Sequence, residues 1–327
     1  MKLNKRKWLP LACLALLGSP GCIDSAQAGQ GRLRALLAAR GQAEKAPLPA
    51  DVIERHLQSG GVDRSYLLLD GSRGSQPAPL IIALHGGGGS AATMVPRWYA
   101  KARAEGLVIA FPDGVGRNGR MGTWNAGGCC GFAMTSDSDD VAFVASVIDA
   151  VQKTQRIDPR RIYVTGMSNG GMLTHKVAIA LADRLAGAAV VAGALFGDER
   201  SPSVPVPVLI MHGVKDQVVG FEGGNSPLDF VARAQSKPFE PVKYAVDFWV
   251  SADGCTSAPV TSASGEVTTT DYRQCRDGSE VLFYRLASAT HTWPGASNAM
   301  KMLETTPYTA VNATDVIWDF FKKHARR

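Results

Sequence analysis

The stretch Arg161-Ile-Tyr-Val-Thr-Gly-Met-Ser-Asn-Gly-Gly171 decides the fold of this chain. Its β-branched and aromatic residues 162–165 predict a short strand, and the apolar pattern of residues 171–181 predicts a helix. Between them lies Gly166-Met-Ser-Asn-Gly170, which has the form G-x-S-x-G. A serine at such a sharp turn is held in a strained conformation, and flanking glycines let the two backbone arms pass closely. We therefore predict that Ser168 is a nucleophile; an ordinary Gly-Ser turn is the alternative.

Predicted strands and helices alternate on both sides of this turn. Two strands, 55–59 and 64–70, are expected to form a hairpin around Gly60-Gly61. Apolar runs predict buried strands at 79–84, 106–113, 188–195, 206–212 and 281–285, and apolar periodicity predicts helices over 144–151, 242–251 and 310–323. This alternation predicts an α/β fold with a mostly parallel central sheet, helices on both faces and an antiparallel hairpin at its start. No large cap domain is expected.

The N-terminus is typical of an export signal. Lys2 to Lys7 form a basic head, residues 8–18 are mostly apolar, and the segment ends Ala26-Gln-Ala28. We predict a signal peptide at 1–28, a flexible tether at 29–50 and one catalytic domain at 51–327. Cleavage near Ala28 would give a secreted or periplasmic protein. Lipidation at Cys22 is the less favoured alternative and would be the only reason to expect a membrane partner.

The net charge gives no case for a nucleic-acid partner. Residues 1–28 hold four of the basic side chains and one acidic one, so their removal lowers the formal charge from +6 to +3. Four cysteines remain after cleavage: Cys129, Cys130, Cys255 and Cys275. In an oxidising compartment they should pair, with three possible connectivities, one of which joins Cys255 to Cys275 and Cys129 to Cys130. Their spacing does not favour a metal site.

A serine nucleophile needs a histidine base, and the histidine needs an orienting carboxylate. In this fold type the chain order is Ser, then Asp or Glu, then His, each after a strand. Asp216 follows the predicted strand 206–212, and His291 follows the last strand, so we predict Ser168, Asp216 and His291 as the triad. Asp198 is the rival carboxylate.

The other histidines after Ser168 are interpreted differently. His175 lies in the predicted helix and His324 in the basic tail, so each is expected to be a surface or helix residue. His212 is expected to be a packed residue at a strand end.

A glycine run, His85-Gly-Gly-Gly-Gly-Ser90, follows the buried strand 79–84. We predict an oxyanion hole in which one backbone N–H comes from Gly87 or Gly88 and the other from Asn169. A flexible linker is the alternative, and a phosphate loop is excluded because no Gly-Lys-Ser or Gly-Lys-Thr follows.

Several motifs together resemble the secreted α/β-hydrolase esterases of the polyhydroxybutyrate depolymerase-like and feruloyl esterase-like family. They are Leu84-His-Gly-Gly-Gly-Gly89, Trp124-Asn-Ala-Gly-Gly-Cys-Cys-Gly131, Asp139-Asp-Val-Ala-Phe143, Gly166-Met-Ser-Asn-Gly-Gly-Met172, His212-Gly-Val-Lys-Asp-Gln-Val-Val219 and His291-Thr-Trp-Pro-Gly295. The resemblance runs from about Arg64 to the C-terminus. It implies the α/β-hydrolase fold, the same triad, an acyl-enzyme, and no metal or organic cofactor. Gly220-Phe221 replaces a proline and tyrosine that such enzymes often carry.

The expected substrate is a small or oligomeric ester, feruloyl-type or hydroxyalkanoate. Trp124 and Trp293 are candidates to flank the substrate, although both could be packed core residues. A non-catalytic exported binding protein on the same scaffold and a peptidase of the same fold are the alternatives. The sequence leaves the oligomeric state open.

Overall fold

The computed structural model describes residues 47–117, 121–296 and 307–326. The predicted signal peptide 1–28 and residues 29–46 of the predicted tether lie outside the described residues. The described residues from Pro49 onward form one compact unit.

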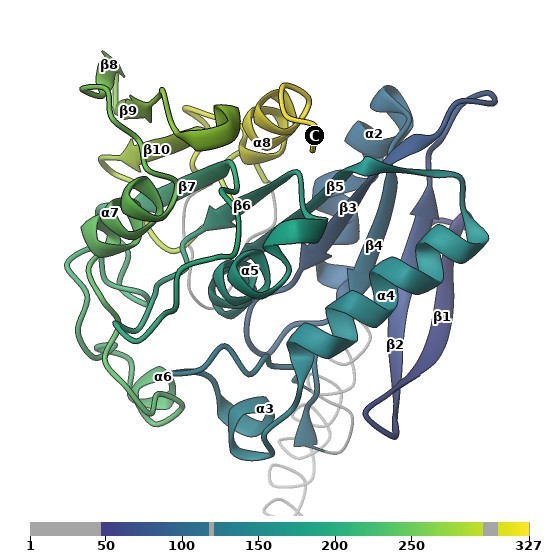
Figure 1. Ribbon diagram of the computed structural model, residues 1–327. Coiled ribbons are helices and arrows are strands. Elements are labelled where there is room, and N and C mark those ends of the chain that lie inside the picture. Colours follow the sequence, from purple (N-terminus) through teal and green to yellow (C-terminus); the bar gives the residue numbers. More distant parts are fainter. Residues whose placement is uncertain (1–46, 118–120, 297–306, 327) are drawn as a thin grey trace, which may run out of the picture. The chain divides into compact units, whose positions relative to one another are not determined.

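A single ten-stranded sheet runs through this unit (Figure 1). Its order is β1-β2-β4-β3-β5-β6-β7-β10-β9-β8. The strands are β1 (Val52–Ser59), β2 (Val62–Asp70), β3 (Ala78–Leu84), β4 (Val108–Pro112), β5 (Ile157–Met167), β6 (Gly187–Val191), β7 (Val208–Gly213), β8 (Val260–Ser264), β9 (Val267–Tyr272) and β10 (Val281–Leu286). The six strands from β4 to β10 in this order are parallel neighbours, while β1 and β2 at one end and β9 and β8 at the other pair antiparallel.

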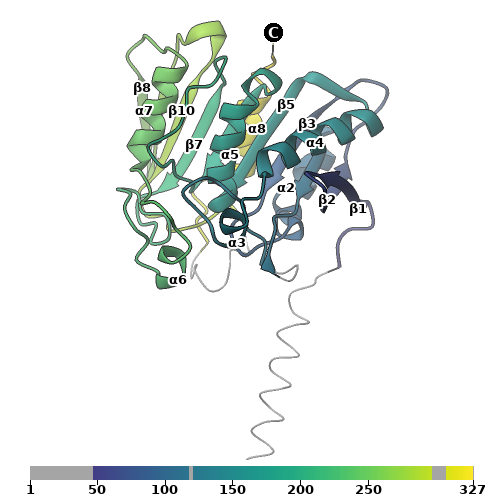
Figure 2. The ribbon, with the colours of Figure 1, turned by 60° about the horizontal axis from the view of Figure 1, so that its bottom comes forward.

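Helices cover both faces of the sheet (Figure 2). On one face lie α4 (Asp140–Thr154), α5 (Asn169–Ala180) and α7 (Val242–Ala252), with Phe143, Leu173 and Trp249 among their buried side chains. On the other lie α2 (Val95–Glu105) and α8 (Ala313–Phe321), with Trp98 and Phe320 among their buried side chains. The short helices α3 (Gly131–Thr135) and α6 (Asp229–Ala232) lie in the connecting loops. The predicted α/β architecture and its opening hairpin are confirmed.

Three elements differ from the sequence prediction. The segment between Cys255 and Cys275, for which no strand was predicted, contains the β8–β9 hairpin; β8 is exposed, β9 is mostly half-buried, and both carry little apolar signal. The strand predicted at 188–195 ends at Val191, because Ala192 takes a positive φ of 50° and turns the chain away from the sheet. The last helix begins at Ala313, where the Asn312 side chain accepts a hydrogen bond from the N–H of Asp315 and caps it.

Candidate active site

Ser168 lies at the apex between β5 and α5, with φ 56° and ψ −126°. This conformation is unfavourable for a residue with a side chain, so surrounding contacts must hold it. One of them is the hydrogen bond that the Ser168 N–H donates to the Val191 carbonyl at 2.9 Å. Glycines are required on both sides: a Cβ on Gly166 would collide with the Gly170 carbonyl, and one on Gly170 with the His85 carbonyl. The predicted strand, sharp turn and helix are therefore present, and Ser168 stays about 9% exposed.

The parallel strands bring the three predicted triad residues to one edge of the sheet. Met167 on β5 is level with Val191 on β6, which is level with Met211 on β7, and Met211 with Tyr284 on β10. The chain leaves β5, β7 and β10 just beyond this row, and the loops that follow carry Ser168, Asp216 and His291. The carboxyl edge of a parallel sheet is the usual place for a ligand site in open α/β folds.

Asp216 is a buried carboxylate with a full set of hydrogen-bond donors. Its Oδ1 accepts from the N–H groups of Val218 and Val219, each at 2.8 Å, and its Oδ2 accepts from His291 Nδ1 at 2.8 Å. Burial by itself would raise the pKa of Asp216, but the neighbouring His291 and the hydrogen bonds from His212 and His291 hold that pKa below its usual range. Asp216 is thus ionised at neutral pH and can orient an imidazole and stabilise its charge.

His291 has one nitrogen occupied and one available. Because an ionised carboxylate only accepts hydrogen bonds, Nδ1 carries the proton that it shares with Asp216 and Nε2 is the basic nitrogen. Nε2 is buried and has no hydrogen-bond partner among the described residues, Ser168 included. The rival Asp198 is exposed and pairs with Lys237 instead.

The glycine run packs directly against the serine turn. A Cβ on Gly87 would lie 3.5 Å from the Asn169 Cβ, so the two backbones are in contact distance. Gly88 donates its N–H to the Gly122 carbonyl at 2.8 Å and Gly89 donates to the Gly86 carbonyl at 3.0 Å. Of the two glycines considered, Gly87 is therefore the one whose N–H, like that of Asn169, has no backbone acceptor among the described residues.

The His85 side chain holds the glycine run in place by hydrogen bonds to backbone groups. Its ring is fully buried, and burial lowers its pKa to about 4, so the ring is neutral. Nε2 accepts from the Gly114 N–H at 2.9 Å, which leaves Nδ1 as the donor to the Gly86 carbonyl at 2.8 Å. The ring thus joins the glycine run to the loop after β4.

Trp124 connects the same two segments. Its indole N–H donates to the His85 carbonyl at 2.8 Å. The Asn169 side chain clamps its backbone from the other side: Asn169 Oδ1 accepts from the Trp124 N–H at 2.7 Å, and Nδ2 donates to the Trp124 carbonyl at 3.0 Å. The side chain of Asn169, the residue after Ser168, therefore holds Trp124 and the described part of the loop after β4 in place, while the Asn169 N–H has no backbone acceptor among the described residues.

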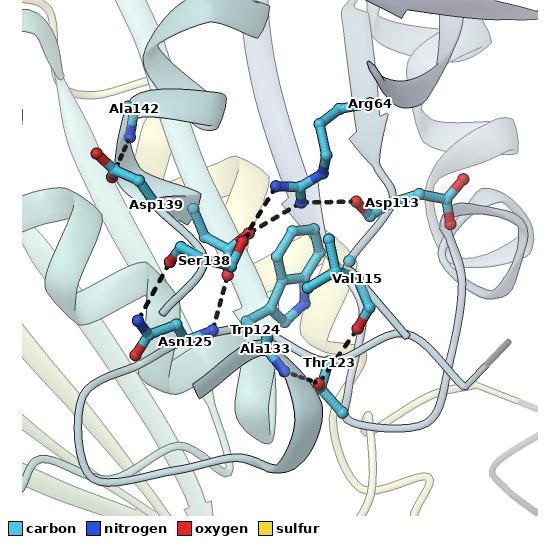
Figure 3. Close-up of polar contacts among 12 residues, drawn as sticks. Arg64, Asp113, Val115, Thr123, Trp124, Asn125, Ala133, Ser138, Asp139 and Ala142 are labelled. Atoms are coloured by element: carbon cyan, nitrogen blue, oxygen red, sulfur yellow. Dashed lines mark hydrogen bonds and ion pairs between the residues drawn. The ribbon is translucent and has the colours of Figure 1, made fainter. Parts of the chain in front are cut away.

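A buried ion pair between Arg64 and Asp140 holds the same loop at Asn125 (Figure 3). Arg64 donates to Asp140 Oδ1 at 2.9 Å and to the Asp113 carbonyl at 3.0 Å. The other oxygen of Asp140 accepts from the Asn125 N–H at 2.7 Å. Asn125 follows Trp124 directly, so the ion pair and the Asn169 clamp hold adjacent residues of one loop. Sequence reasoning had given neither Arg64 nor Asp140 a role at the site.

Neither predicted substrate tryptophan has an open face in this structure. Trp124 is fully buried, and Trp293 is 1% exposed. Trp293 donates its indole N–H to Thr314 Oγ1 at 3.1 Å and borders a cavity of about 420 Å³ between α2 and α8, which no predicted triad residue lines. Both rings thus pack as core residues, and a contact of either with substrate stays a prediction.

The cysteines form two disulfides, Cys129–Cys130 and Cys255–Cys275. This is the connectivity that pairs each cysteine with its sequence neighbour. Across residues 47–117, 121–296 and 307–326, no cluster of three or more metal-ligating side chains occurs, and no helix there is long and apolar enough to cross a membrane.

Comparison with known proteins shows to which family the chain belongs. Residues 71–238 match the phospholipase/carboxylesterase family. The chain belongs to this family of α/β-hydrolases. Feruloyl esterase B of Piromyces equi is 33% identical over 225 residues, which are 64% of this chain and 39% of that protein. Feruloyl esterase C of Emericella nidulans is 28% identical over 232 residues, 68% of this chain and 74% of that protein.

A solved structure supports the fold. The acetyl xylan esterase from Aspergillus awamori superposes with a TM-score of 0.52, covers 73% of this chain and 94% of its own, and is 14% identical. The named relatives support an ester-hydrolase function for this member of the family, which agrees with the resemblance seen in the motifs.

Proposed function

We propose that this protein is a serine carboxylesterase in which Ser168, Asp216 and His291 act as the triad. The observation that carries the proposal is that the strained Ser168 and an Asp216–His291 pair joined at 2.8 Å lie on loops at the same carboxyl edge of the sheet. In this proposal the unoccupied Nε2 of His291 is the base for the Ser168 hydroxyl.

The reaction follows from these groups. His291 Nε2 takes the proton of Ser168 Oγ as Oγ bonds to the ester carbonyl carbon, and the carbonyl oxygen becomes an anion. The N–H groups of Gly87 and Asn169 donate to that oxygen. The His291 imidazolium then gives its proton to the leaving alcohol oxygen as the carbon–oxygen bond breaks, which leaves an acyl-serine. A water molecule repeats the sequence, losing its proton to His291, and releases the acid and Ser168.

We infer a feruloyl-type ester as the first substrate class, with hydroxyalkanoate esters second. Two relatives are feruloyl esterases, which supports the first class, and the motif resemblance covers both classes. We also propose that the mature protein is secreted or periplasmic, which its two disulfides support.

The test is Ser168→Ala, with Ser264→Ala on the exposed edge strand β8 as the matched control. We expect Ser168→Ala to lose roughly a million-fold in kcat on methyl ferulate and p-nitrophenyl acetate, and to lose labelling by a fluorophosphonate probe. Ser264→Ala should behave as wild type. Wild-type activity in Ser168→Ala, or a wild-type protein that the probe does not label, refutes the proposal. A parallel series with hydroxybutyrate oligomers ranks the two substrate classes.

A further inference from the structure

A second histidine binds the carboxylate that the proposed triad uses. His212 lies near the end of β7, and its Nε2 is 3.3 Å from Asp216 Oδ2, the same oxygen that accepts from His291. The side chains of His212 and Asp216 are both fully buried. The sequence had suggested only a packed residue at a strand end.

The surroundings of His212 determine which of its nitrogens carries the proton. Nε2 also lies 2.8 Å from the Val219 carbonyl. A carbonyl oxygen and an ionised carboxylate can only accept, so Nε2 must be the protonated nitrogen and its N–H is shared between the two. His212 therefore ties Asp216 to Val219, whose own N–H donates to the other oxygen of Asp216.

A third buried imidazole stands behind His212. The indole N–H of Trp249 donates to His175 Nδ1 at 3.0 Å, so the proton of His175 is on Nε2. Burial, and then the neighbouring His212, lower the pKa of His175 to about 3, so its ring is neutral. Within the described residues, His175 Nε2 and His212 Nδ1 make no hydrogen bond, and one is a donor while the other is an acceptor.

Few charged groups face His212. Asp216 and the proposed base His291 lie on one side and the neutral His175 on another. On β10, Arg285 is level with His212, but its guanidinium lies over the ring of Phe221, which stands edge-on to His212 at 6.0 Å between ring centres. Among the residues that the structure describes, Asp216 is therefore the charged partner in close contact with His212.

We propose that His212 is a positioning residue for the triad: its Nε2–H fixes the rotation of the Asp216 carboxylate so that Oδ2 stays aimed at His291 Nδ1, and it withdraws part of the negative charge from that oxygen. This inference rests on the proposed triad. Without His212, the donor to Oδ2 would be His291 itself, the ring that Asp216 has to orient, whereas the Nε2–H of His212 holds Oδ2 independently of His291. Because the Nε2–H of His212 withdraws negative charge from Oδ2, Asp216 should stabilise a protonated His291 less than it would without this hydrogen bond.

Two variants of similar size separate positioning from packing. In His212→Gln the amide nitrogen reaches about the place of Nε2 and can still donate to Asp216, while in His212→Asn it falls short, near the place of Nδ1. We expect His212→Gln to keep kcat within about threefold of wild type. His212→Asn should lower kcat about 10- to 100-fold at unchanged KM for methyl ferulate, because the substrate still binds and only the base is misplaced.

The pH profile gives a readout that simple loss of packing would not move. Without the His212 hydrogen bond, the full charge of Asp216 acts on His291 and favours its protonated form. The acid limb of kcat/KM should therefore shift to higher pH in His212→Asn and return to the wild-type position in His212→Gln. Equal kcat and equal acid limbs in His212→Asn and wild type would overturn the inference.

A measurement on the wild-type protein keeps the test open if His212→Asn does not fold. Nitrogen-15 NMR of labelled histidines should show a proton on His212 Nε2 that takes part in a hydrogen bond. A His212 Nε2 without a proton overturns the inference. Failure of the proposed function is distinguishable, because a wild-type protein that lacks esterase activity and probe labelling would refute the triad whatever the state of His212.

Discussion

Substitution of Asn169 by alanine should weaken the fold and the reaction together. The Asn169 side chain makes two buried hydrogen bonds to the Trp124 backbone, at 2.7 and 3.0 Å. Asn169→Ala leaves the N–H of Trp124 buried without a partner, while the Trp124 carbonyl still accepts from the N–H groups of Ala126 and Cys130. A buried polar group that loses its only partner costs about 1–3 kcal/mol, and the lost bond to the still-paired carbonyl costs about 1 kcal/mol more, so the free energy of unfolding should fall by about 2–4 kcal/mol. This is a large part of the ~5–15 kcal/mol available to a typical domain.

The same variant should lower kcat. The Asn169 N–H is one of the two proposed oxyanion donors, and its place depends on the clamp that holds it against Trp124. Loss of one such donor costs about 100- to 1,000-fold in kcat, and a loosened donor costs up to that amount. The backbone N–H survives in Asn169→Ala, so we expect a loss of about 10- to 100-fold on methyl ferulate with a smaller change in KM.

Urea unfolding followed by tryptophan fluorescence, with steady-state kinetics at low urea, measures both effects. Asn312→Ala is the matched control: it also removes an asparagine hydrogen bond, but at the exposed start of α8, and should cost about 1 kcal/mol with unchanged kcat. If Asn169→Ala unfolds at the wild-type urea concentration and keeps the wild-type kcat, the clamp does not hold the site and the reasoning is refuted.

Two further predictions concern stability away from Ser168. Burial raises the pKa of Asp253 to about 6 from 3.8, so ionisation opposes folding: the stability present below about pH 4 is lost as pH rises through 6. Asp253→Asn, whose amide can still pair with Ser279, should add up to about 3 kcal/mol at pH 7.5 and nothing at pH 3.5 in urea titrations, and an equal effect at both pH values would contradict this. The disulfide Cys255–Cys275 spans 20 residues, so the double serine variant should lose about 3 kcal/mol in the same assay while kcat on p-nitrophenyl acetate stays unchanged; a fall in kcat would show that the β8–β9 edge supports the site.

The turn between β5 and α5 is a feature that could be predicted from the local sequence. The apolar runs around Ser168 predicted the strand and the helix because burial and periodicity are properties of neighbouring residues. The glycines predicted a close backbone crossing, and the structure shows two collisions that a side chain would cause at Gly166 and Gly170. The order of Ser168, Asp216 and His291 along the chain was enough to choose loops that the parallel strands bring to one edge.

Contacts between segments that are far apart in the sequence could not be predicted from local patterns. His212 was expected to be a packed strand-end residue, but the turn after β7 brings the Asp216 carboxylate back onto it. For Trp124 the sequence left open a substrate contact or a packed core residue; its environment is set by His85 and Asn169, which come from two other segments. An aromatic side chain has the same sequence signal in a core and in a cleft, so only the packed structure separates the two.

The sequence by itself determined the α/β architecture, the strained turn at Ser168 and the loops that carry its proposed partners, because each depends on local pattern and chain order. Three features came from packing in three dimensions: among the described residues the Gly88 N–H has a backbone acceptor and the Gly87 N–H has none, Asn169 clamps Trp124, and two imidazoles share Asp216. A hydrogen bond between two loops forms only within a narrow range of donor–acceptor distance and angle. The positions of these groups are set by how the whole sheet and its helices pack.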